Sequence, residues 1–332
     1  MGPLRQMLQR MNPHSGVDTA EEVLARRPDA IHATEDAPAR FDLLRGGEGM
    51  HGMRPTLRSL PHMVASQRGV QKTLSDLDEI PRHPKTRLPA DELAELEAYA
   101  KSLGVASIGY TEVPQHLIFR DKAVLYDHAI VLTMEMNRRK MATAPSRRSQ
   151  LAAMEVYHHL GDASIRMTHF LRERGYAAHA GHPLMGLALY PPLAQMAGLG
   201  WRGQHGMLIT PEFGPRVRLA AVFTDIENLP FFTGENLHSW IPEFCALCGQ
   251  CVRRCPGNAI YETPVPRDNG LVTCVDVTKC FPQFVDNHGC SVCIKDCPFH
   301  RGLYDRLKRH VLKRRPTQRA SHPPNASPRE RA

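Results

Sequence analysis

The sequence predicts a chain of the α+β or α/β class, in which an α/β layer domain is followed by a small cysteine-rich module. Two observations carry this prediction. Segments with helical and with strand-like periodicity alternate over residues 90–225, which is typical of layered α/β domains. All nine cysteines then lie between Cys245 and Cys297. With 332 residues, the chain has room for two domains, or for one large domain with a small one attached.

The elements of the α/β region follow from the spacing of its apolar residues. Helical spacing, with Asp91 as an N-cap and Gly104 as a stop signal, begins the series. Helices are expected over residues 91–103, 147–174 and 190–198. Short apolar runs predict strands over residues 105–110, 128–135, 206–210 and 216–225.

Composition divides the chain into four regions. The first is an N-terminal extension rich in Arg, His, Pro and Gly, expected to be partly irregular. The α/β domain, the cysteine module and a basic disordered tail follow, with a proline-bounded linker over 230–242. The four regions are expected at residues 1–85, 86–235, 236–312 and 313–332.

The positive charge is concentrated at the C-terminus. Residues 301–332 hold ten Lys and Arg against Asp305 and Glu330, which accounts for the whole net charge of +8. Such a tail is either a solvated segment or an arm for an acidic partner such as tRNA. No run approaches the roughly 20 apolar residues of a membrane span, and no secretory signal is recognised, so a cytoplasmic location is expected.

The cysteines follow an iron–sulfur pattern. Cys245, Cys248, Cys251 and Cys255, the last followed by a proline, have the spacing C-x2-C-x2-C-x3-C-P. In bacterial ferredoxins with two clusters, the fourth cysteine of such a run binds the other cluster. A near repeat follows, with Cys280 set back from a C-x2-C-x3-C-P run.

The crossing rule assigns eight cysteines to two [4Fe-4S] clusters of a ferredoxin-like module. One cluster takes Cys245, Cys248, Cys251 and Cys297, and the other takes Cys255, Cys280, Cys290 and Cys293. Cys274 is left over, although it is an alternative to Cys280 as a ligand. Structural zinc is the competing interpretation, but it normally uses two separated C-x2-C pairs. Two neighbouring clusters carry electrons, so an external low-potential electron donor is expected.

The segment from Ala197 to Asp225, with its Gly-Leu-Gly-Trp and Thr-Pro-Glu-Phe-Gly-Pro-Arg-Val-Arg stretches, resembles the corresponding segment of reductive dehalogenases. It resembles epoxyqueuosine reductases more loosely. Both families are cobalamin-dependent reductases with two [4Fe-4S] clusters. The resemblance covers residues 90–300 and implies a nitroreductase-like, corrinoid-binding α/β domain. It also implies that electrons pass through the clusters to cobalamin to reduce a small organic substrate, which in the dehalogenase branch is halogenated.

The resemblance implies roles for particular residues. Tyr157 matches the tyrosine that donates a proton in reductive dehalogenases, and Arg218 supplies a cation beside it. A neighbouring cation makes a tyrosine a better acid. Both also have ordinary structural interpretations, as an amphipathic-helix residue and a strand arginine. The residues expected to contact the corrinoid are His182, Met185, Gly198, Gly200 and His205.

Two features depart from the families. Epoxyqueuosine reductases place an acidic aspartate ahead of the Gly-Leu-Gly-Trp stretch, yet no carboxylate occurs between Glu173 and Glu212. The region around Leu184 and Met185 is apolar instead, with His182 as the nearest polar substitute. The second departure is that no export signal is recognised, whereas respiratory dehalogenases are exported.

Two alternatives are kept open: an epoxyqueuosine reductase, and a ferredoxin-type electron carrier without corrinoid.

Overall fold

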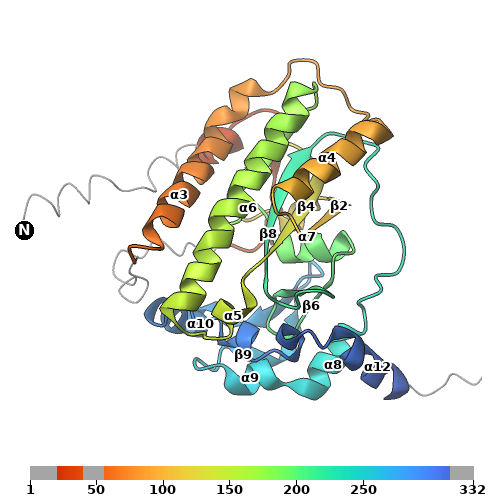
Figure 1. Cartoon of the computed structure of the whole chain (residues 1–332). Helices are drawn as coiled ribbons and strands as arrows, with labels where there is room; N and C mark the ends of the chain where they lie inside the picture. Colours follow the sequence, from red (N-terminus) through yellow and green to blue (C-terminus); the bar gives the residue numbers. More distant parts are fainter. Residues whose placement is uncertain (1–20, 40–55, 315–332) are drawn as a thin grey trace, which may run out of the picture.

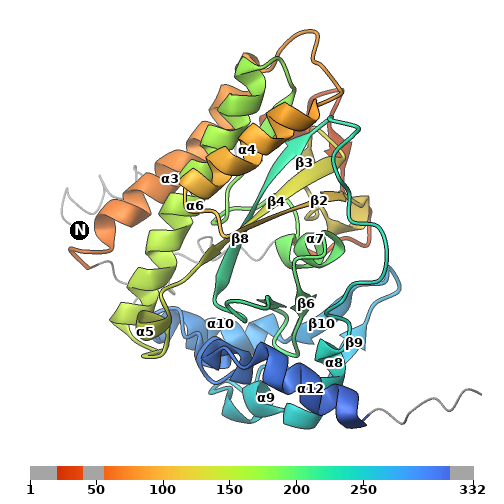
Figure 2. The ribbon, with the colours of Figure 1, turned by 45° about the vertical axis from the view of Figure 1, so that its right-hand side comes forward.

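The computed structural model describes residues 21–39 and 56–314. A four-stranded sheet carries helices on both faces, and the cysteine-rich module lies below one end of the sheet (Figures 1 and 2). The larger helices are α3 (Leu60–Ser75), α4 (Ala90–Ser102), α6 (Arg147–Glu173) and α7 (Tyr190–Met196). The sheet strands are β2 (Ser107–Glu112), β4 (His128–Glu135), β5 (Ala178–Gly181) and β8 (Val217–Thr224). Smaller elements are β1 (Ile31–His32), η2 (Asp76–Glu79), η3 (Gln115–Leu117), β3 (Ala123–Val124), α5 (Arg138–Met141), β6 (Trp201–Arg202) and β7 (Leu208–Ile209).

The sheet has the strand order β2-β4-β8-β5, and all three pairings are antiparallel. Strand β4 is paired along its full length with β8, from His128 opposite Thr224 to Glu135 opposite Val217. Successive side chains of a strand point to opposite faces, so Ile130 and Leu132 enter one core cluster and Val131 enters the other. The domain is therefore layered as expected, with an antiparallel rather than a parallel sheet.

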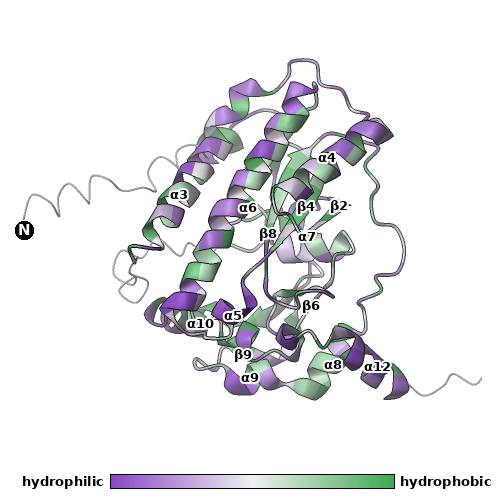
Figure 3. Cartoon of the chain, viewed as in Figure 1, coloured by the Kyte–Doolittle hydropathy of each residue, from purple (hydrophilic) through white to green (hydrophobic). Residues whose placement is uncertain are grey.

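Helices α4 and α6 cover one face of the sheet, whereas α7 packs on the other. Helix α3 lies alongside α6 (Figure 1). The outer surfaces of α3 and α6 are hydrophilic, and the strands beneath them are hydrophobic (Figure 3). In the described ranges, no helix combines the length and the apolar composition needed to cross a bilayer.

Two elements of the core were not predicted from sequence. Helix α3 falls in the extension that was expected to be partly irregular, and its buried positions include Ser66 and Thr73 beside Val70 and Leu74. A buried stripe with polar members gives a weak apolar periodicity. Strand β5 is made of small residues around His179, which have low strand propensity. The predicted disordered tail from residue 315 onward lies outside the described residues.

The cysteine module consists of short helices around a hairpin. Its elements are α8 (Ile241–Cys248), α9 (Gln250–Arg254), β9 (Ile260–Pro266), β10 (Val272–Val275), α10 (Val277–Asp286), α11 (Val292–Lys295), η4 (Pro298–Arg301) and α12 (Tyr304–Arg314). Helix α8 begins just before Pro242, inside the predicted linker, and α12 runs past the boundary expected at residue 312.

The loop around β6 and β7 joins the sheet domain to this module. The Gln204 side-chain amide donates to the backbone oxygens of Tyr261 and Glu262, both at 2.7 Å. Gly214 has a φ of +57°, and a Cβ there would lie 2.5 Å from the Phe299 carbonyl oxygen. Only glycine fits so close an approach. The segment that carries the family resemblance is thus the contact between the two parts.

We predict that Gly161→Ala destabilises the protein. A Cβ at Gly161 would lie 2.1 Å from Nε2 of the buried His182 ring. Helix propensity alone favours alanine by about 1 kcal/mol, but overpacking should reduce the free energy of unfolding by about 1–3 kcal/mol. Urea denaturation measures the change. The exposed substitution Asp162→Ala on the same helix is the control, and equal stability of both variants would contradict the packing argument.

Candidate functional site

The first predicted set of cysteines comes together at the start of the module. Helix α8 carries Cys245 and Cys248, and α9 carries Cys251. Gly249 joins the two helices in the left-handed conformation, and its N–H donates to the Cys245 carbonyl. Burial raises the pKa of Cys297 well above its usual value, and the thiols of Cys245, Cys251 and Cys248 raise that pKa further. The four thiols are therefore neighbours.

The second set also comes together. Burial raises the pKa of Cys293 to about 12, and Cys290 and Cys280 are the thiols with the next largest effects. Cys255 affects the pKa of both Cys280 and Cys290 after burial. Cys251 and Cys255 likewise contribute to the raised Cys293 pKa. Since Cys251 belongs to the first set, the two sets lie next to each other.

The spread of the thiols suits a cluster better than a single ion. In a tetrahedral zinc site with Zn–S bonds of about 2.3 Å, sulfur atoms lie about 3.8 Å apart. All nine cysteines are described, and no three of them bring their Sγ atoms within 4.8 Å of one another. The thiols of each set thus face one another without touching. This leaves room for a cubic cluster, whose iron atoms separate the thiolates.

Cys274 has other neighbours. After burial, Cys251 and Cys248, its thiol adds to the raised pKa of Cys245 in the first set. It lies in β10 and is buried. Gly206 packs against it, because a Cβ built on Gly206 would lie 3.4 Å from the Cys274 Cβ. Burial raises its pKa, and the nearby Arg202 guanidinium lowers it. Cys280, by contrast, has Cys255 and Cys290 beside it. The geometry thus favours Cys280 as the ligand and leaves Cys274 against the β6–β7 loop.

Tyr157 and Arg218 meet between α6 and β8. The Arg218 Cζ lies over the Tyr157 ring, 4.7 Å from its centroid, in a cation–π contact. The Nε of Arg218 is buried without a hydrogen-bond partner. Within the described ranges, no hydrogen bond ties up the Tyr157 hydroxyl. A tyrosine that is positioned by an arginine but has a free hydroxyl is suited to donate a proton to a bound molecule.

The other arginine of the Pro-Arg-Val-Arg stretch has a different environment. Arg216 is buried and forms an ion pair with Glu135 on the neighbouring strand. Because a strand alternates its side chains, Arg216 and Arg218 start on the same face two residues apart. Among the residues that the structure describes, Arg216 pairs with a carboxylate and Arg218 does not. Arg216 therefore stabilises the sheet, and Arg218 remains available.

The residues expected to contact the corrinoid are not all in one place. His182 is buried beside α6, and burial lowers its pKa to about 3, with a further lowering by His158. Its Nδ1 accepts from the Leu184 N–H, and its Nε2 has no partner. His205 is also buried, next to the module, and burial lowers its pKa to about 4. Its Nε2 is unpartnered too.

The remaining three residues pack against other parts of the chain. Gly198 and Gly200 fit closely against the chain itself, because a Cβ would meet the Phe232 ring at 2.6 Å or the Ile209 oxygen at 2.2 Å. Met185 packs in the core cluster on the α7 face, whereas Tyr157 packs in the cluster on the α6 face. The five residues together with Tyr157 therefore do not line a single surface.

Comparison with known proteins gives the cysteine module its identity. Residues 238–261 match the family model described as "4Fe-4S binding domain". A 207-residue stretch is 31% identical to the tetrachloroethene reductive dehalogenase of Sulfurospirillum multivorans, covering 59% of this chain and 40% of that protein. A 117-residue stretch is 32% identical to the epoxyqueuosine reductase of Listeria monocytogenes, covering 33% of this chain and 29% of the relative. The chain is related to the reductive dehalogenases and epoxyqueuosine reductases.

Solved structures agree on the fold of this superfamily. A catabolic reductive dehalogenase, NpRdhA, superposes with a TM-score of 0.68 at 19% identity, over 86% of this chain and 45% of that one. A reductive dehalogenase whose structure is described as suggesting a mechanism for B12-dependent dehalogenation superposes with a TM-score of 0.64. The chain thus spans less than half the length of these relatives. The chain is related to iron–sulfur oxidoreductases, and it carries a 4Fe-4S module in its C-terminal part.

We predict that Cys274→Ser and Cys297→Ser differ in iron content. Cys297 lies among three thiols of the first set, so its loss should remove or weaken one cluster, leaving about four of eight irons per chain. Cys274→Ser should retain both clusters. Iron analysis and EPR of anaerobically reconstituted protein measure this. Loss of a cluster in Cys274→Ser, with Cys280→Ser unaffected, would reverse the assignment.

Proposed function

We propose that the chain is a cobalamin-dependent reductase that passes electrons through two [4Fe-4S] clusters to reduce a halogenated organic substrate. The carrying observation is the contact of Arg218 with the Tyr157 ring. Sequence similarity to reductive dehalogenases over 59% of the chain supports the same conclusion. The absence of any carboxylate between Glu173 and Glu212 speaks against the epoxide chemistry of the other branch.

Tyr157 would act as the proton donor. Reductive removal of a halide leaves negative charge on carbon, and a proton completes the product. The Arg218 guanidinium would stabilise the phenolate that forms when the Tyr157 proton leaves, since the two groups already touch. The buried, unpartnered Nε of Arg218 has a hydrogen bond left to give to a bound group.

The surrounding residues fit a corrinoid in their chemistry. Buried polar atoms without a partner normally indicate a missing one, and the Nε2 atom of His205 is such an atom. This histidine would hold an amide side chain of the corrin ring, whereas the Nε2 of His182 faces the glycines of α6 and α3. When bound, the corrinoid would supply a low-potential cobalt centre that reduces the substrate. Tyr157 and Arg218 would orient the substrate and hold the proton.

The two sets of cysteines would serve the same reaction as an electron route. Cys251 and Cys255 lie one helical turn apart in the chain, yet they belong to different sets. Adjacent clusters would pass electrons in single steps from an external donor towards the sheet domain. The β6–β7 loop, which is held against β9 by Gln204, would keep the clusters at a constant distance from Tyr157 and Arg218.

A binding experiment tests the cofactor. Anaerobically reconstituted protein incubated with cobalamin should retain about one corrin per chain after gel filtration, read from its absorption spectrum. Clusters without any retained corrinoid would overturn the proposal and favour a ferredoxin-type carrier. Restoration of queuosine in a strain lacking epoxyqueuosine reductase would favour the tRNA-modifying alternative instead.

We predict that Tyr157→Phe abolishes turnover without loss of the cofactor. The ring and its contact with Arg218 remain, but the proton donor is lost, so kcat should fall about 10²–10⁴-fold. Halide release from a brominated phenol, with a chemical reductant, measures the rate. Tyr99→Phe is the matched control, because the Tyr99 ring stacks on Phe170 of α6 rather than on Arg218. Unchanged halide release by Tyr157→Phe would exclude Tyr157 as the donor.

A further inference from the structure

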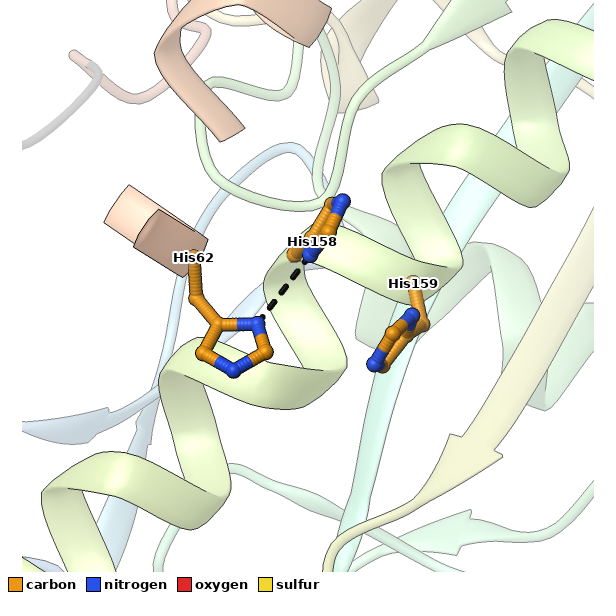
Figure 4. A group of neighbouring side chains, drawn as sticks. All are labelled: His62, His158 and His159. Carbon is orange, nitrogen blue, oxygen red and sulfur yellow. Dashed lines mark hydrogen bonds between the residues drawn. The ribbon is translucent and has the colours of Figure 1, made fainter. Parts of the chain in front are cut away.

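Three histidines from two helices gather beside the proposed site. His62 comes from the first turn of α3, and His158 and His159 come from the middle of α6 (Figure 4). One nitrogen of each ring lies within 4.8 Å of the others. Sequence reasoning missed this group because α3 was not predicted, so nothing indicated that His62 would lie beside α6.

The distances suit metal coordination. The Nδ1 atoms of His62 and His158 are 3.1 Å apart. Two nitrogens on a tetrahedral zinc ion, with Zn–N bonds of about 2.0–2.1 Å, lie about 3.4 Å apart. The rings of His158 and His159 are stacked, with centroids 4.7 Å apart. Small rotations of the side chains would therefore bring three imidazole nitrogens around one ion.

The charge environment of the group also suits a metal. In the part of the chain that the structure describes, none of the three rings forms an ion pair with a carboxylate. Burial lowers the pKa of His158, and its two histidine neighbours lower it further. Neutral imidazole is the form that binds metal. A second group, Asp76, Glu79 and His169, is already occupied by its own ion pairs.

An ion can reach the histidines from solvent. His159 is exposed, and His62 lines a cavity of about 480 Å³. Arg58, Arg148 and Lys140 also line this cavity. The Lys140 ammonium is paired with Glu155, with N–O distances of 2.6 and 2.7 Å. Because the two arginines repel a cation, the exposed side of His159 is the favourable approach for an ion.

We propose that His62, His158 and His159 bind a divalent transition-metal ion, with zinc as the reference ion and water as a further ligand. Imidazole ligands suit zinc, nickel and copper. The ion would join the first turn of α3 to the centre of α6, and it would fix α3 over the buried His182. The site does not depend on a bound corrinoid or on the cysteine clusters.

Equilibrium dialysis with Zn²⁺, followed by metal analysis, tests the site on untagged protein with both clusters reconstituted. The wild type should retain one zinc per chain. His62→Ala and the exposed substitution His159→Ala should each weaken zinc binding at least tenfold. His83→Ala and His169→Ala are the controls and should retain the ion. Bound zinc should also raise the Tm of the wild type, and not that of His159→Ala.

Equal zinc retention by the wild type and by His159→Ala would overturn the proposal, because that substitution lies at an exposed position and leaves the core intact. Loss of zinc only in His169→Ala would place the ion at the acidic group instead. Iron content and far-UV circular dichroism of each variant show that the module and the helices are formed.

An independent observation concerns a cavity between α5 and the cysteine module. A second cavity, of about 560 Å³, is lined by Arg138, Arg139, Lys295, Asp296 and Arg301. Four of these five charges are positive. Lys295 and Asp296 stand in the chain between Cys293 and Cys297, which belong to different sets. A positively charged hollow therefore opens beside ligands of both clusters.

We infer that this cavity receives an acidic electron-donor protein, and this inference rests on the proposed role of the clusters in accepting external electrons. Oppositely charged surfaces accelerate association at low ionic strength. A donor placed here would lie beside both clusters. The basic residues of the cavity would thus determine how fast the clusters are reduced, independently of corrinoid or substrate.

Stopped-flow bleaching of the clusters by an acidic flavodoxin tests this without requiring turnover. The double substitution Arg139→Glu and Arg301→Glu should slow bleaching at least tenfold at low salt, and high salt should remove the difference. Reduction by dithionite should be unchanged. The control variant reverses Lys308 and Arg309 on α12. Equally slow bleaching in both variants, or no effect in either, would overturn the inference, whether or not the chain binds a corrinoid.

Discussion

The contact between the β6–β7 loop and the cysteine module is the constraint on which the proposed electron route depends. Gln204 donates two hydrogen bonds to backbone oxygens of β9, and Gly214 packs against the backbone of Phe299. In both contacts the module contributes backbone carbonyl groups, so the loop is held against the backbone of the module and not against its side chains. A buried amide that satisfies two carbonyls is costly to separate. The cysteine sets and the sheet domain are thereby held as one unit.

The same segment continues directly into β8, which positions Arg218. Gly214, the later of the two contacts, precedes by only three positions Val217, where the strand that delivers the cation to Tyr157 begins. Strand alternation places both arginines on the same face, so their neighbours decide which arginine has which task. Arg216 meets Glu135 at the end of β4 and is neutralised, whereas Arg218 meets the Tyr157 ring of α6. One short motif thus stabilises the sheet and equips the site.

Sequence reasoning was accurate where periodicity is strong and local. The expected helix over 147–174 is α6, and the expected strands over 128–135 and 216–225 are β4 and β8. It failed at α3, whose buried stripe contains serine and threonine, and at β5, which consists of small residues around a histidine. The five residues expected to contact the corrinoid lie in different parts of the structure. Two of them, Gly198 and Gly200, are glycines because the chain packs closely on itself there.

The sequence alone determined the character of the C-terminal module, because the spacing of thiols along a short chain controls which of them can converge. It also determined the α/β alternation, because hydrophobic period is a property of neighbouring residues. Only the tertiary structure decided the antiparallel strand order, the contact of Arg218 with Tyr157 and the meeting of His62 with His158. These pairs lie 61 and 96 residues apart in the chain, and no local pattern encodes which distant side chains the packing of helices on a sheet brings into contact.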